Sequence, residues 1–158
     1  MADLRERVKD ATKDAMKQKA TIRLATLRLV NAAIKDKEIS ARVEGQERPL
    51  SEMDILAIMS KMVKQRLESA RAYEEAGRLD LAERERTEID IVEEFLPKKL
   101  TVDEVEDAIA AAIAETGAAS IRDMGRVMGV LKSAYTGQID FGSVGPAVKQ
   151  RLSALASG

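Results

Sequence analysis

The sequence has no cysteine and no histidine among its 158 residues. The first absence excludes disulfide bonds, a thiolate nucleophile and thiolate zinc sites. The second excludes Ser-His-Asp and Cys-His catalysis, and with it the side chain that most often transfers protons near neutral pH. An enzyme of this composition would depend on carboxylates, lysine or hydroxyl groups alone. We therefore expect no catalytic residues, no metal and no cofactor.

Aromatic residues make up only 3% of the chain, and tryptophan is absent, whereas Ala, Leu, Glu, Lys and Arg are abundant. Strands draw on aromatic and β-branched residues, and helices draw on the residues that are abundant here. The composition therefore predicts an all-α protein. Its hydrophobic content of 45% is enough for a buried core in a chain of this length.

Long apolar runs are also missing. No run approaches the roughly 20 residues that a membrane-spanning helix needs. The amino-terminal stretch MADLRERVKD is too charged for a signal peptide. We expect a cytoplasmic protein with no membrane partner.

The formal net charge of -1 argues against strong nonspecific binding to nucleic acid, and we expect no DNA partner. The charges are nevertheless segregated along the chain. Residues 1–40 carry an excess of Lys and Arg, residues 74–107 are strongly acidic, and residues 121–158 are again basic. A protein close to neutral can thus still present a basic surface to a ligand.

Apolar residues recur at helical spacing in seven segments. A break falls at Leu96-Pro97, because the residue before a proline avoids the α region and the proline cannot donate within a helix. We place a subdomain boundary there. The expected organisation is an N-terminal helical bundle over residues 1–96 and a small three-helix unit over residues 97–158, with a polar loop from Gly45 to Pro49 inside the first.

The second helix, from Thr21 to Arg42, has two adjoining apolar stripes, which indicate the central helix of a bundle. One stripe is Ile22, Ala25, Leu29 and Ala33, and the other is Leu27, Val30 and Ile34. The polar side places Arg28, Asn31 and Lys35 in one row. This row either faces solvent or forms a secondary ligand surface.

The most informative stretch is SIRDMGRVMGVLKSAY, residues 120–135. At 100° per residue its apolar side chains fall on one half of a helix. The other half carries Arg122, Gly125, Arg126, Gly129 and Lys132, so two glycines lie among basic residues. Each glycine costs a helix roughly 1 kcal/mol relative to alanine, and something must require the bare backbone. Either another helix crosses closely there, or a phosphodiester backbone approaches while the cations bind phosphates.

The last helix is expected to begin with Ser143 as its N-cap and Pro146 in its first turn. Its buried side would comprise Val144, Val148, Leu152 and Leu155. An acidic run in the fourth helix is best interpreted as a solvated face, because its carboxylates spread around the helix and lack the spacing of a calcium-binding loop.

Three stretches, in order, resemble the YqeY family of small bacterial proteins: TLRLVNAAIKDKEI, AGRLDLAERERTEIDIVEEFLPKKLTVDEVE and TGAASIRDMGRVMGVLK. That family is similar to the tail domain of the GatB subunit of aspartyl/glutamyl-tRNA amidotransferase. The resemblance to the tail rests mainly on Gly125-Arg126-Val127-Met128. Gly137 and Asp140 add a weaker similarity.

The resemblance implies two helical subdomains and a link to tRNA, since the tail helps hold tRNA in the amidotransferase. It does not imply catalysis by this chain, because the amidase and activating sites of that enzyme lie outside the tail. The family is associated with carbon-nitrogen ligase activity that uses glutamine as donor, and we interpret that activity as a property of the whole amidotransferase complex. We expect a non-catalytic accessory module that binds tRNA through Arg122, Gly125, Arg126, Gly129 and Lys132. The alternative is a protein-interaction module, with an amidotransferase or another protein as partner, that uses the same face.

Overall fold

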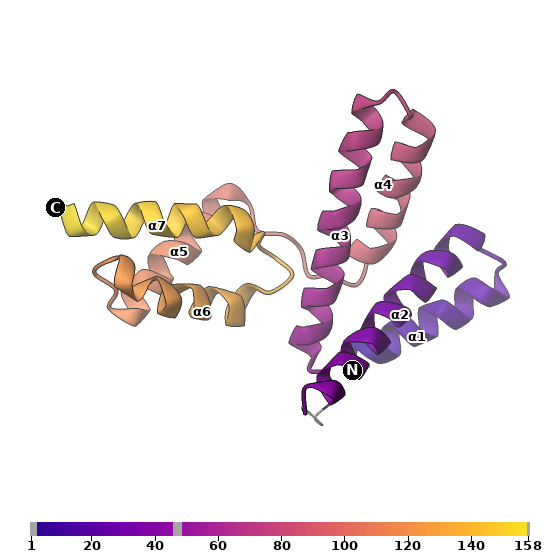
Figure 1. Cartoon of the computed structure of the whole chain (residues 1–158), viewed down its shortest axis with the longest axis horizontal. Coiled ribbons are helices and arrows are strands. Elements are labelled where there is room, and N and C mark those ends of the chain that lie inside the picture. Colours follow the sequence, from indigo (N-terminus) through magenta and orange to yellow (C-terminus); the bar gives the residue numbers. More distant parts are fainter. Residues whose placement is uncertain (1–2, 46–48, 158) are drawn as a thin grey trace. The chain divides into compact units, whose positions relative to one another are not determined.

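The computed structural model describes residues 3–45 and 49–157. Within these residues it contains seven α-helices and one short 3-10 helix, and no strand (Figure 1). The predicted all-α fold class is confirmed. No helix in the described ranges combines the length and the apolar composition needed to cross a membrane. Residues 46–48 of the expected Gly45 to Pro49 loop lie outside the described residues.

The chain forms two compact units, one ending at Pro97 and the other beginning at Lys98. The connection between them is short. Leu96 packs on the core of the first unit, and Leu100 already packs on the core of the second. A break at Pro97 allows the preceding helix to extend to Leu96, but the last helix of the first unit ends three residues earlier, at Glu93.

The N-terminal unit contains α1 (Leu4–Lys17), α2 (Thr21–Val43), α3 (Glu52–Glu75) and α4 (Leu79–Glu93). Asp3 caps α1, and Ser51 and Asp54 form a capping box at the start of α3. α1 lies beside α2 and α3 beside α4, and α2 also contacts α3 and α4 (Figure 1). The deepest core side chains are Val8, Leu27, Val30, Met59 and Val92.

One ion pair joins α3 to α4 close to this core. The Nε atom of Arg66 lies 3.2 Å from Oε2 of Glu88, and the two side chains are only 14% and 12% exposed. Arg84 approaches the other carboxylate oxygen of Glu88 at 3.5 Å. The charge of Glu88 is therefore compensated from both helices.

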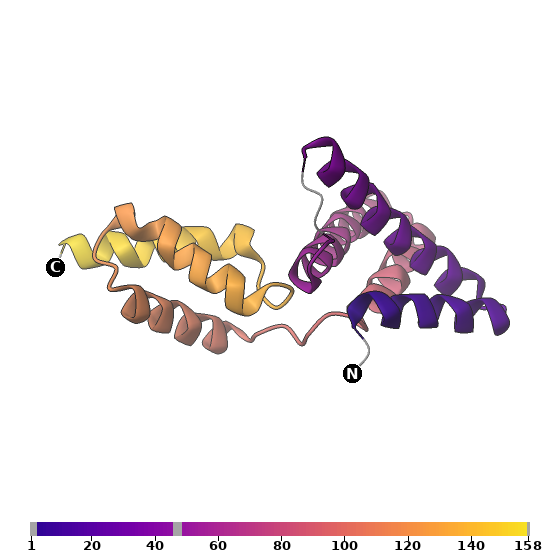
Figure 2. The same ribbon diagram turned by 90° about the horizontal axis from the view of Figure 1, so that it is seen from below.

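The C-terminal unit contains α5 (Val102–Thr116), the 3-10 turn η1 (Ile121–Asp123), α6 (Met124–Tyr135) and α7 (Phe141–Ser157), as Figure 2 shows. Thr101 and Glu104 form a capping box at the start of α5, and Gly117 ends the helix in the left-handed conformation with φ 66°. The core consists mainly of Ile109, Val127, Leu131, Val148 and Leu152.

Two expectations about helix faces and one about a helix start are wrong. The expected stripe on α2 is exposed except at Ala33, which packs on the core, because α1, α3 and α4 pack against the opposite side from the other three residues, Ile22, Ala25 and Leu29. In α7, Leu155 is 51% exposed, and the helix begins at Phe141, before Ser143.

The start of α7 depends on Asp140. Its Oδ1 accepts from the Gly142 N–H at 3.1 Å, and its carbonyl accepts from the N–H groups of Ser143 and Val144. Ser143 therefore lies inside the first turn. It donates its hydroxyl to the Asp140 carbonyl at 3.0 Å.

Candidate functional site

The start of α6 is built around the carboxylate of Asp123. Its Oδ2 accepts from the backbone N–H of Ala119 at 2.8 Å and from that of Ser120 at 3.2 Å. These bonds hold the loop that follows Gly117 against η1. Hydrogen bonds from Ala119, Arg126 and Ser120, in that order, lower the pKa of Asp123 from 3.8 to about 2. The carboxylate is therefore ionised at neutral pH.

Arg126 fixes the same loop from the other side. Its Nη2 pairs with Oδ1 of Asp123, and its Nη1 donates to the Thr116 carbonyl at 3.1 Å. Because that carbonyl lies in the last turn of α5, the guanidinium connects the end of one helix to the start of the next. The side chain remains 62% exposed, but part of its charge is compensated by Asp123.

Gly125 and Gly129 both lie on the exposed side of α6. A Cβ atom added at either position would meet nothing within 4 Å. Neither glycine needs its freedom for a positive φ, since both lie inside the helix. Close packing within the described chain therefore does not explain either glycine.

Arg122 lies in η1, before the two glycines in the sequence, and Lys132 lies on α6 after them; both are exposed. Neither side chain has an ion-pair partner within residues 3–45 and 49–157. We call the surface formed by Arg122, Gly125, Arg126, Gly129 and Lys132 the α6 face. It presents two uncompensated cations, one partly compensated cation and a bare stretch of helix backbone between them.

The polar row on α2, Arg28, Asn31 and Lys35, is only partly exposed. Arg28 and Lys35 are exposed, but Asn31 is half-buried and donates its side-chain N–H to the hydroxyl of Thr12 at 3.1 Å. That hydroxyl in turn donates to the Val8 carbonyl at 2.7 Å. Asn31 therefore connects α2 to α1 and is not presented to a ligand.

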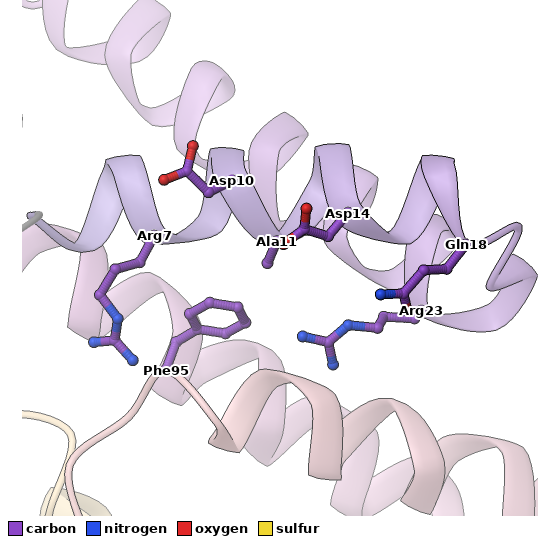
Figure 3. A pocket seen from close by; sticks show the side chains of 7 residues that line it. All are labelled: Arg7, Asp10, Ala11, Asp14, Gln18, Arg23 and Phe95. Carbon is purple, nitrogen blue, oxygen red and sulfur yellow. The ribbon is translucent and has the colours of Figure 1, made fainter.

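The N-terminal unit contains an open cavity of about 510 Å³ that was not predicted from the sequence. Figure 3 shows the ring of Phe95 between the side chains of Arg7 and Arg23, with Asp10 and Asp14 above it on α1. The Arg7 guanidinium carbon lies 5.6 Å from the ring centre, and Arg23 pairs with Glu94. No motif signalled this cavity, because its residues come from three separate segments.

The two arginine side chains that line this cavity are already bound within the N-terminal unit. Both arginines have partners from the segment after α4, since Arg7 also donates to the Glu94 carbonyl at 3.4 Å. Phe95 is only 7% exposed and offers no platform for stacking. In the described part of the chain, no group of three or more carboxylates is placed to hold a metal ion.

The fold and the α6 face define a two-unit helical protein with a small basic surface on its C-terminal unit. Residues 5–152 match the family model described as Yqey-like protein. The chain belongs to this family, as the resemblance predicted.

Curated relatives include fungal proteins named "Altered inheritance of mitochondria protein 41, mitochondrial". The protein from Lachancea thermotolerans is 34% identical over 63% of this chain and 51% of its own length. The protein from Meyerozyma guilliermondii is 38% identical over 53% of this chain and 41% of its own length. The chain thus spans about half the length of the curated relatives it matches, or less.

These relatives correct one expectation. The sequence predicted a cytoplasmic protein, whereas the names of the relatives from Lachancea thermotolerans, Clavispora lusitaniae and Eremothecium gossypii all state that they are mitochondrial. The prediction of a cytoplasmic location is wrong by this comparison. The lack of a long apolar run and the charged amino-terminal stretch were an insufficient basis for it.

Proposed function

We propose that this protein binds tRNA through the α6 face and acts as a non-catalytic accessory module in tRNA-dependent amide formation. The observation that carries the proposal is the exposure of Gly125 and Gly129 between two uncompensated cations. A nucleic-acid backbone can approach a bare helix more closely than a helix covered by side chains. Arg122 and Lys132 would then contact phosphates on either side of the bare backbone.

The resemblance to the GatB tail supports the same assignment, since the tail helps to hold tRNA. The match in this chain includes Gly125 and Arg126, which both lie on the α6 face. Arg126 differs in role from Arg122 and Lys132, because its guanidinium already binds Asp123 and the Thr116 carbonyl. It positions the loop before α6 and contributes less charge to a ligand.

The competing function is a protein-interaction module whose α6 face receives a helix from a partner. The pairing of Arg126 with Asp123 favours this alternative, because it partly compensates one of the three cations on this face, and affinity for nucleic acid comes mostly from neutralised phosphates. Small residues four apart would let the partner helix approach closely.

A salt titration of tRNA binding distinguishes the two functions. Each lost phosphate contact flattens the log-log dependence of affinity on salt by about 0.7 to 0.9. The variant Arg122→Gln/Lys132→Gln should therefore bind more weakly, with a slope flatter by about 1.4 to 1.8. The control Lys9→Gln/Lys13→Gln removes the same charge from exposed positions on α1 and should leave the slope unchanged. Equal slopes for all three proteins would refute tRNA binding through the α6 face.

A further inference from the structure

The outer side of α2 carries an apolar row that no part of its own unit covers. Four of its members are large side chains with 43%, 48%, 49% and 83% of their surface exposed: Ile22, Leu29, Ile39 and Val43. Ala25 and Ala32 are also exposed. We call these six residues the outer seam. The core contacts of α2 lie on the opposite side, at Leu27, Val30 and Ile34.

The spacing of the outer seam is that of a coiled coil. Its positions alternate between three and four residues apart, which is the repeat that lets one helix lie along another. The only interruption is Asp36, which is exposed and occupies the position of the same pattern between Ala32 and Ile39. A single polar residue in such a seam sets the register of the partner helix.

A row of cations follows one edge of the outer seam. Arg28, Lys35 and Arg42 are spaced by seven residues, so each lies two turns from the next on the same edge. All three are exposed, and none has an ion-pair partner among the residues that the structure describes. We call these three residues the basic row. Charges at the edges of a coiled-coil seam select the partner.

We propose that the outer seam docks an amphipathic helix of another protein, with acidic side chains along the edge that meets the basic row. The partner helix would place apolar residues in the seam and a Lys or Arg opposite Asp36. This mode is helix-in-groove recognition, with the charges fixing orientation and register. The inference concerns the N-terminal unit and does not depend on RNA binding by α6.

Three other occupants fit the outer seam and the basic row less well. In an antiparallel pair of two α2 helices, each basic row would face the other and repel it. A membrane surface would bury the carboxylate of Asp36 among lipid chains, at a large desolvation cost. RNA would leave the apolar seam without a partner, since α2 has no aromatic side chain on which a base could stack.

The probe for this proposal is a synthetic peptide of three heptads with Leu in its seam, one Lys opposite Asp36, and Glu on both edges. A second peptide carries Lys in place of those Glu residues. The intact protein should bind the Glu peptide at least about tenfold more tightly than the Lys peptide, as measured by fluorescence anisotropy. Arg28→Glu/Lys35→Glu/Arg42→Glu should reverse that preference.

The apolar part of the site is tested with Leu29→Gln/Ile39→Gln, which should abolish binding of the Glu peptide. The matched control is Leu79→Gln on α4, whose side chain is 68% exposed, and it should bind like the wild type. All of these positions are exposed, so circular dichroism should show folded variants.

Several results would overturn the proposal. They are equal affinity for the two peptides, no binding of either, or the same loss in Leu79→Gln. Self-association that Leu29→Gln abolishes would assign the seam to a second copy of the chain. Seam-dependent binding to phosphatidylcholine/phosphatidylserine vesicles would assign it to a membrane surface. Loss of tRNA binding in the charge-reversal variant, without any peptide preference, would assign the basic row to RNA.

Discussion

Asp123 and Arg126 are paired across one turn at the start of α6, with Nη2 of the arginine on Oδ1 of the carboxylate. The same carboxylate accepts the backbone N–H groups of Ala119 and Ser120 through its other oxygen. A residue that looked like one of three equivalent phosphate ligands is therefore part of the structure that holds α6 in place. Arg122 and Lys132 remain as the cations available to a ligand.

The hydrogen bonds to Asp123, first that from the Ala119 N–H and then that from Arg126, predict acid sensitivity in the C-terminal unit. The pKa of Asp123 is lowered from 3.8 to about 2 on folding, so its contribution to stability is fully present above pH 3.8 and disappears as the pH falls through about 2. Asp123→Asn should lower the melting temperature at pH 7. It should also remove part of the stability loss between pH 4 and pH 2. Thermal melts across this range test the effect, and unchanged melts of the variant at pH 7 would contradict it.

The ion pair between Arg66 and Glu88 predicts a second effect on stability. Arg66→Met leaves the carboxylate of Glu88 largely buried and dependent on Arg84 alone, and should destabilise the N-terminal unit by about 2 to 3 kcal/mol. The double variant Arg66→Met/Glu88→Leu should recover much of the loss, because two apolar groups then replace the pair. Urea unfolding of both variants tests this coupling. A double variant as unstable as the single one would show that the charges are not coupled.

Much of the fold was predictable because local signals agree with tertiary packing. Thr101 with Glu104, Ser51 with Asp54, and Gly117 each determine a helix end through contacts within a few residues. Such signals can be recognised from the sequence alone, because the residues involved are close together in the chain. The end of α4 was less predictable: the helix stops at Glu93, and Phe95 and Leu96 beyond it pack on the core, which no local signal indicates.

Which face of a helix is buried was less predictable than where the helix lies. Ile22 and Leu29 have the spacing and apolar character of core residues, and only the placement of α1, α3 and α4 shows that they face solvent. Asn31 shows the opposite error. It was expected on an exposed polar row, but its side-chain amide donates to the hydroxyl of Thr12 on α1. The partner of Arg126 lay only three residues away in Asp123, and a search for local charge pairs would have found it.

The two units should be separable. Each has its own hydrophobic cluster and its own capped helices, so cleavage of the chain near Pro97 should leave two helical fragments. Circular dichroism of residues 1–97 and 98–158, produced separately, tests this. Loss of helical signal in both fragments would contradict the division.

The protein should be catalytically silent in the reaction that its resemblance suggests. Purified protein given glutamine, ATP and Glu-tRNA should form no Gln-tRNA, because the chain lacks cysteine and histidine and matches no amidase motif. Aminoacyl-tRNA analysis after removal of any contaminating amidotransferase provides the measurement. Turnover that persists in that preparation would contradict an accessory role.

The double variant Gly125→Ala/Gly129→Ala tests the central claim most directly, with melting temperature and tRNA affinity measured on the same sample. Alanine meets no atom within 4 Å at either position and favours the helix by up to about 1 kcal/mol per site, with the larger gain at Gly129 because Gly125 lies in the first turn. The account predicts a higher melting temperature together with weaker tRNA binding. A raised or unchanged melting temperature with undiminished tRNA affinity would contradict the claim that these glycines are bare for RNA.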